Sequence, residues 1–249
     1  MAREVSSISR VGTSEPFELQ VSRGHIAYHK RLHKFGFNSP INETEETVWD
    51  VGGTYSYQSS ALAMTVTSAS GATDSGVEVT VQGLDSSYKE VSATVTLNAS
   101  GTATTTQTFL RVNRAFISGS GAPAGTINIT NSSTTYARIT AGENQTLMAV
   151  WTVPAGYTAY LFQKDTSCLT EANNKFGTIR LISRNPGGVF RTQDKFSVQN
   201  GHSEISYTTP LPFPEKTDIE ARAVGSSSNS ALHVSVAFDI IYVKNGSDL

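Results

Sequence analysis

The sequence of 249 residues has one cysteine and few charged side chains. Cys168 has no second cysteine to pair with, so the chain cannot form an intramolecular disulfide, and a reducing site of synthesis is compatible with it. Only 16% of the residues are charged, and the formal net charge is -2. This composition excludes a chain-wide basic surface of the kind that binds nucleic acid or anionic membranes.

Export and membrane-spanning segments are also missing from the sequence. The first ten residues, MAREVSSISR, carry charge and hydroxyl groups but no apolar stretch. No later stretch approaches the roughly 20 consecutive apolar residues that cross a bilayer. We therefore expect neither export nor a membrane partner.

Signatures of catalysis are equally scarce. No serine, threonine or cysteine lies in a recognisable nucleophile elbow, and no glycine-rich phosphate loop opens a helix. Asp50, Asp74 and Asp85 lie near glycines, which is typical of turns, and no calcium-loop spacing surrounds them. We expect no catalytic residue, no cofactor and no enzymatic activity.

Alternation of apolar and polar residues is the dominant pattern, and helical periodicity is nearly absent. In residues 77–81 three valines share one face of the chain, and residues 91–97 repeat the pattern after a short polar connection. This predicts an antiparallel hairpin. The clearest run is 232–242, where large apolar side chains occupy every second position.

Further strand candidates follow at similar spacing, separated by clusters of Gly, Pro, Ser and Asn. They comprise residues 105–116, 125–130, 136–140, 146–153, 157–163, 177–183, 194–198, 204–208 and 218–224. Many short strands without intervening helices favour sandwiches over parallel α/β sheets. We predict an all-β fold with two antiparallel β-sandwich or jelly-roll-like domains, residues 46–141 and 142–249, after an extended N-terminal arm over residues 1–45.

Three histidines in the predicted arm could suggest a metal site. His25, His29 and His33 are four residues apart, so a helix would align them along one face. However, Gly24 and Gly36 interrupt a helix, no HExxH glutamate is present, and an extended strand would not bring the three imidazoles to one ion. We favour the interpretation without a metal.

The same arm mixes basic and aromatic residues, which makes it a candidate for binding a partner. A basic and aromatic segment could follow a nucleic-acid strand, but the rest of the chain supplies no extended basic groove. Docking on an acidic surface of a neighbouring protein is therefore favoured. The candidate residues are Arg23, His25, Tyr28, Lys30, Arg31, Lys34, Phe35 and Phe37.

A second aromatic group lies just after the arm. Trp49, Tyr55 and Tyr57 could form a platform that stacks on the apolar faces of sugars. Aromatic residues at strand spacing belong more often to a core or an interface. A carbohydrate-binding module therefore stays the weaker alternative.

Several runs of residues resemble structural proteins of tailed, especially marine, bacteriophages. The runs VSRGHIAYHKRLHKFGFN (residues 21–38) and ETVWDVGGTY (residues 46–55) are similar to the opening of such proteins. The similarity continues in segments within residues 66–156 and covers about residues 21–163.

The resemblance implies a non-enzymatic, β-rich virion component that assembles in the host cytoplasm. A capsid decoration (cement) or minor capsid protein is expected, which stabilises the particle by binding the major capsid protein or other virion proteins through the arm. A homo-oligomer, with a trimer favoured, is expected as well. The alternative within the virion is a tail or fibre component that contributes to host attachment.

Overall fold

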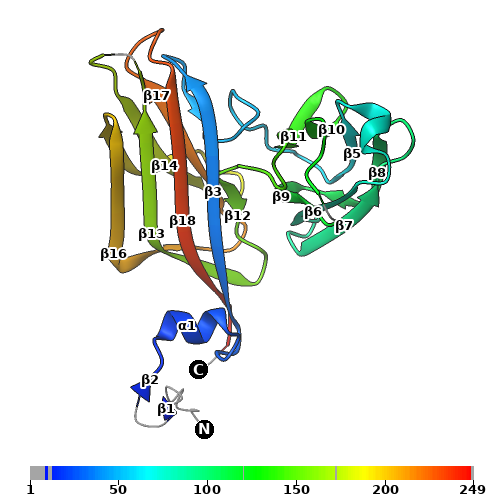
Figure 1. Ribbon diagram of the computed structural model, residues 1–249. Helices are drawn as coiled ribbons and strands as arrows, with labels where there is room; N and C mark the ends of the chain where they lie inside the picture. The colour runs from blue at the N-terminus through cyan, green and yellow to red at the C-terminus, as the bar shows by residue number, and fades with distance from the viewer. Residues whose placement is uncertain (1–8, 11–12, 120, 172, 248–249) are drawn as a thin grey trace.

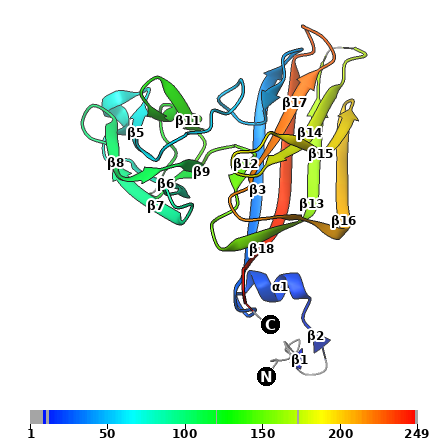
Figure 2. The same cartoon turned by 180° about the vertical axis from the view of Figure 1, so that it is seen from behind.

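The structure is a computed structural model that describes residues 9–10, 13–119, 121–171 and 173–247. These residues are arranged as two β-sandwiches side by side, with a short helix beyond one end of the second sandwich (Figures 1 and 2). The predicted all-β fold is confirmed. The only α-helix of the described residues, α1, has six residues, and no helix in this part of the chain could cross a membrane.

The first sandwich packs a four-stranded antiparallel sheet, in the order β11-β10-β5-β8, against a three-stranded sheet, β7-β6-β9. Its interior contains the apolar side chains that alternate along each strand, such as Val79, Val81 and Ile129. The predicted hairpin is confirmed as β6 and β7, in which Val81 lies opposite Ala93. Its elements are β5 (Leu62–Ser68), the 3-10 turn η1 (Gly71–Asp74), β6 (Glu78–Leu84), β7 (Glu90–Thr96), β8 (Thr102–Phe109), β9 (Arg111–Ile117), β10 (Ile127–Asn131) and β11 (Thr134–Ile139).

The second sandwich packs the sheet β16-β13-β18-β3 against the sheet β12-β17-β14-β15, with β4 paired to β17. Leu161, Ile179 and Phe238 are fully buried between the sheets, and Cys168 is buried in the same core. The apolar alternation of 232–242 lies on β18, as predicted. The strands are β3 (His29–Ile41), β4 (Glu46–Thr47), β12 (Val150–Thr152), β13 (Tyr157–Leu169), β14 (Gly177–Arg184), β15 (Arg191–Val198), β16 (Gly201–Phe213), β17 (Asp218–Gly225) and β18 (Leu232–Lys244).

The prediction of an extended arm is wrong for residues 29–41. These residues form β3, which pairs antiparallel with β18 from His29 opposite Val243 to Ile41 opposite Leu232. Without β3, β18 would present a long unpaired edge of backbone donors and acceptors, and pairing satisfies them. The first strand of the second sandwich, β3, therefore comes from the segment that the sequence predicted to be a free arm.

The part of the predicted arm before β3 contains β1 (Ser9–Arg10), β2 (Thr13–Ser14) and α1 (Phe17–Ser22). Val21 and Ile26 are buried against Ile241 of β18, so this segment is anchored to the outer side of the second sandwich. The arm's residues 1–8 and 11–12 lie outside the described residues.

The first sandwich is inserted between two strands of the second. The strands β4 and β12, which lead into it and out of it, both pair with β17. The two connecting segments also contact each other, because Ala149 N donates to Val48 O at 2.9 Å and Trp49 forms a bridge with Met148. This arrangement holds the two sandwiches side by side and creates the cleft described next.

Candidate functional site

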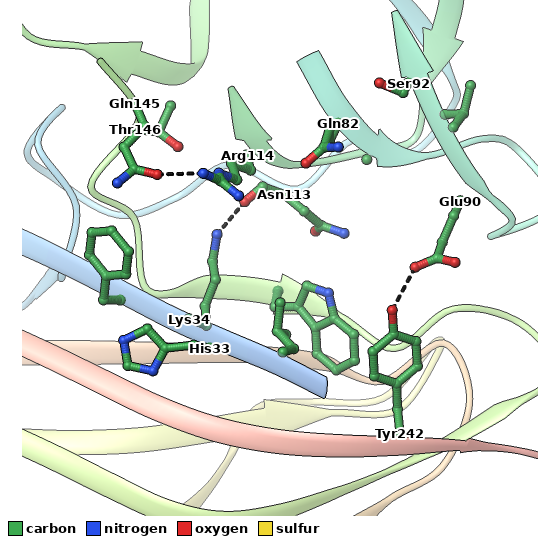
Figure 3. A pocket seen from close by; sticks show the side chains of 15 residues that line it. His33, Lys34, Gln82, Glu90, Ser92, Asn113, Arg114, Gln145, Thr146 and Tyr242 are labelled. Atoms are coloured by element: carbon green, nitrogen blue, oxygen red, sulfur yellow. Dashed lines mark hydrogen bonds between the residues drawn. The ribbon is translucent and has the colours of Figure 1, made fainter. Parts of the chain in front are cut away.

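A cleft of about 660 Å³ lies between the two sandwiches (Figure 3). The second sandwich contributes β3, Trp151 and Tyr242, and the first contributes β6, β7 and β9, with the connecting segment at one end. Its volume falls within the usual range for sites that bind small molecules or peptide side chains. The lining residues, called the cleft below, are Leu32, His33, Lys34, Phe35, Gln82, Gly83, Glu90, Val91, Ser92, Asn113, Arg114, Gln145, Thr146, Trp151 and Tyr242.

One end of the cleft carries two cations. Lys34 projects from β3 with 6% of its surface exposed, and its Nζ donates to the backbone oxygen of Asn113 in β9. Arg114 projects from β9 and donates from Nη2 to Oε1 of Gln145 at 2.6 Å. The two cations come from different sandwiches, so their proximity follows from the packing of the domains.

The charges of Lys34 and Arg114 have no acidic partner among the described residues. None of the ion pairs in this part of the chain involves either side chain. Burial, and to a smaller extent the positive charge of Arg114, lower the pKa of Lys34 to about 7. This end of the cleft therefore has an excess of hydrogen-bond donors and positive charge.

The opposite end of the cleft is electrically balanced. Glu90 of β7 accepts hydrogen bonds from Lys30 Nζ at 2.5 Å and from the hydroxyl of Tyr242 at 2.9 Å. The ammonium group of Lys30 also lies 5.1 Å from the centre of the Tyr157 ring. Burial lowers the pKa of Lys30, but the hydrogen bond and charge of Glu90 outweigh this effect and leave that pKa above its usual value.

The candidate residues of the predicted arm do not form one surface, because side chains alternate between the two faces of a strand. Lys30 and Lys34 face the first sandwich, where they contact Glu90 and Asn113. Arg31 and His33 project to the outer face of the same sheet, and both contact the carboxylate of Asp239.

The other candidates lie in two further places. Phe35 and Phe37 are half-buried and line a second hollow on the outer face of the sheet. Arg23 and His25, in the segment before β3, both lie near Glu15. Tyr28, at the end of that segment, is 55% exposed.

The three histidines lie in different surroundings. His25 Nδ1 lies 3.6 Å from a carboxylate oxygen of Glu15, and His29 Nδ1 lies 2.8 Å from the backbone oxygen of Ala27. His33 contacts Asp239 instead. Within the described ranges, no three His, Cys, Asp or Glu side chains are grouped so that they could hold a metal ion.

The weaker alternative of an exposed aromatic platform at Trp49, Tyr55 and Tyr57 is wrong, and the favoured interpretation as core residues is confirmed for Trp49 and Tyr55. Trp49 and Tyr55 are 2% and 5% exposed and belong to the core of the first sandwich. The indole Nε1 of Trp49 donates to the backbone oxygens of Gly52 and Gly53, and Tyr57 packs edge-on against Tyr55. Trp49 and Tyr55 are therefore buried, and Tyr57 is half-buried against the same core.

Sequence reasoning named Lys34 but missed Glu90, Asn113, Arg114 and Gln145. The missed residues belong to the first sandwich and to the connecting segment, far from Lys34 in the chain. The only local signal was the position of Asn113 and Arg114 on a strand candidate, which does not indicate a partner on another domain.

Comparison with known proteins leaves the chain without an assigned family. No protein-family model matches the sequence, and no curated protein matches it. Among solved structures, the chain is similar to that of infectious bursal disease virus, Gx strain, with 11% identity and a TM-score of 0.29 over 89% of this chain and 73% of that chain. The Gt strain gives 10% identity and a TM-score of 0.24 over 94% and 79%.

A VP2 subviral particle of the same virus gives 13% identity and a TM-score of 0.20 over 90% of this chain and 74% of that chain.

Proposed function

We propose that the protein is a non-enzymatic structural component of a tailed-bacteriophage virion, in the role of a capsid decoration or minor capsid protein. The resemblance of residues 21–163 to structural proteins of such phages supports this proposal. The described residues form two sandwiches joined by buried polar contacts, an architecture suited to a rigid surface subunit. Virion proteins of this kind assemble in the host cytoplasm.

The observation that carries the proposal is a concentration of exposed apolar side chains before β3. Phe17 and Leu19 of α1 are 42% and 47% exposed, and Tyr28 is also largely exposed. They are three of the six large apolar side chains with high exposure among the described residues, yet they lie within one short segment. Exposed apolar groups that cluster in this way mark interaction surfaces.

The segment is anchored on one side and available on the other. Val21 and Ile26 pack against Ile241 and fix α1 to the second sandwich. Phe17, which packs edge-on against His29, and Leu19 both keep much of their surface exposed. We therefore assign the contact with the major capsid protein or another virion protein to this segment, in place of the longer arm expected from the sequence.

We further propose that the protein is a homo-oligomer, with a trimer favoured, because virion components occupy symmetric positions. Sedimentation equilibrium of the purified protein tests this directly. A mass of three chains is the expected result, and a monomer at all concentrations would contradict the oligomer.

Location and copy number in purified particles test the proposed role. A reconstruction of the particle should place the chain on the capsid in hundreds of copies. Small multiples at the tail would instead favour the tail or fibre role, and absence from the particle would overturn the proposal as a whole.

The role of the N-terminal segment has its own test. The double substitution Phe17→Ser and Leu19→Ser should leave the fold unchanged but greatly reduce incorporation into particles, because both side chains are on the surface. Leu169→Ser, at a residue that is 60% exposed on another part of the molecule, is the matched control. Full incorporation of the double variant would contradict the assigned contact.

A further inference from the structure

The cationic end of the cleft has more hydrogen-bond donors than the protein itself uses. An ammonium group has three donors, and the Nζ of Lys34 makes one hydrogen bond within the described residues, to the backbone oxygen of Asn113. A guanidinium group has five donors, and Arg114 makes one hydrogen bond in the same part of the chain, to Gln145. Figure 3 shows both side chains in the same part of the cleft. An acceptor with negative charge would use these donors, which at the exposed Arg114 otherwise face solvent.

The same end of the cleft also has an unused acceptor. The side-chain oxygen of Asn113 is buried and has no hydrogen-bond partner among the described residues. A buried polar atom without a partner costs about 1–3 kcal/mol. A ligand that supplies a donor as well as a negative charge would remove this cost.

The remaining walls of the cleft are partly apolar. Leu32, Val91 and Trp151 line it beside the polar groups. A phosphate ion or a nucleic-acid backbone would offer acceptors to the two cations but neither an N–H for Asn113 nor apolar groups for these walls. A peptide offers all three: a carboxylate, backbone N–H groups and apolar side chains.

We propose that the cleft binds a carboxylate of a partner protein, from an Asp or Glu side chain or a chain end, between Lys34 and Arg114. The carboxylate accepts from both cations, and an N–H of the same peptide donates to the side-chain oxygen of Asn113. Because Lys34 belongs to the second sandwich and Arg114 to the first, the bound group joins the two sandwiches. This inference stands on the geometry of the cleft and does not depend on the proposed virion role.

The first test is a titration of the isolated full-length protein, followed by two-dimensional NMR of the backbone amides. The probe is a blocked peptide in which two glutamates are flanked by leucines, and the matched control replaces both glutamates by glutamine. The glutamate peptide should shift the amide signals of residues 82–83, 113–114 and 145–146, and should bind at least about tenfold more tightly than the glutamine peptide. Equal binding of the two peptides, or no shift at these residues, would overturn the proposal.

The second test uses variants of the two cations. Arg114→Gln and Lys34→Met should each weaken binding of the glutamate peptide by about tenfold or more, since each removes a charge-assisted hydrogen bond. Arg114 is exposed, so we expect the Arg114→Gln variant to fold normally. If Lys34→Met does not fold, Arg114→Gln still tests the proposal. Lys195→Gln and Arg191→Gln, at exposed positions on β15 outside the cleft, are matched controls that should bind like the unaltered protein.

Two further probes separate a peptide carboxylate from other anions. Inorganic phosphate and a ten-nucleotide single-stranded oligothymidylate should bind at the same residues more weakly than the glutamate peptide. Tighter binding of either probe would overturn the assignment to a protein carboxylate and favour a phosphate ligand.

Discussion

Arg111 of the first sandwich and Asp218 of the second form a buried, two-point ion pair. Arg111 Nε donates to Asp218 Oδ1 at 2.8 Å, and Nη2 donates to Oδ2 at 3.1 Å. Both side chains are largely shielded from solvent, with 7% and 4% of their surfaces exposed. Asp218 also accepts from Thr152 at 2.6 Å and from Arg184 at 3.0 Å. This network joins the two sandwiches through a buried carboxylate.

Replacement of Arg111 by methionine should destabilise the protein by about 2–4 kcal/mol, because it leaves part of the Asp218 charge buried without its partner. Urea unfolding at neutral pH measures this change. Arg191→Met, at an exposed position of β15, should change the free energy of unfolding by less than about 0.5 kcal/mol. A loss below about 1 kcal/mol for Arg111→Met would show that the pair does not hold the sandwiches together.

Gly36 allows β3 to pass directly over the two segments that connect the sandwiches. A Cβ at this position would lie 2.2 Å from Val48 O and 2.3 Å from Ala149 N. These two backbone atoms are hydrogen-bonded to each other. Gly36→Ala should therefore cost about 3 kcal/mol or more, measured as the change in thermal and urea unfolding. Gly119→Ala is the control, because nothing lies within 4 Å of an added Cβ there. Equal stability of the two variants would mean that β3 can move away at little cost.

The carboxyl group of Asp50 makes stability depend on pH. Burial raises its pKa to about 7, against the opposing effects of the Thr140 hydrogen bond and the Arg138 charge. Since the usual value is about 3.9, the folded state favours the protonated form. The contribution of this group to stability is complete below about pH 4 and is lost as the pH rises through 7.

Asp50→Asn should accordingly stabilise the protein by about 1–3 kcal/mol at pH 8.5 and have little effect at pH 4. Urea unfolding of the two proteins at both pH values gives the difference directly. The charged groups that act on Asp50 are Arg138, which lowers its pKa, and Glu143, which raises it. A difference that is the same at both pH values would contradict the raised pKa.

Binding of the glutamate peptide to the cleft should also depend on pH. Burial and the neighbouring Arg114 bring the pKa of Lys34 down to about 7, so its ammonium is charged below that pH and mostly neutral above it. Affinity should fall as the pH rises from 6 to 8.5, and binding near pH 7.5 should take up a proton. Calorimetric titration in buffers of different ionisation enthalpy measures both effects.

The other titratable and charged groups around Lys34 come from β9, β7, β18 and β3 itself. Arg114 lies on β9, and Glu90 from β7 lies at the opposite end of the cleft in contact with Lys30 and Tyr242 of β18. His33, the neighbour on β3, contacts Asp239 on the other face of the sheet. In Lys34→Met the fall in affinity between pH 6 and 8.5 should disappear, and an unchanged fall would assign it to another group.

The features that could be predicted from the sequence are those determined by residues close together along the chain. The hairpin of β6 and β7 and the long strand β18 follow from alternating side chains and a short polar turn. β3 was missed because its inward positions include Lys34, Gly36 and Asn38, which break the apolar alternation. Its partner β18 also lies about 200 residues away along the chain, beyond any local pattern.

The candidate site was predictable only in part. Lys30 and Lys34 were named for their charge, but the sequence placed them on a free arm together with Arg31 and Phe37. In the structure, the alternation of side chains along β3 places Lys30 and Lys34 on the opposite face from Arg31 and Phe37. Lys34 lies near Arg114, and Lys30 contacts Glu90.

The sequence by itself determined that this chain is a β protein without a disulfide, since side-chain alternation and composition act over a few residues. Only the tertiary structure decided that β3 pairs with β18 and that the first sandwich is inserted between β4 and β12. Backbone hydrogen bonds between strands are the same for every residue type, so the choice of partner depends on how all the buried faces pack together. That collective choice placed two cations from distant parts of the chain in one cleft.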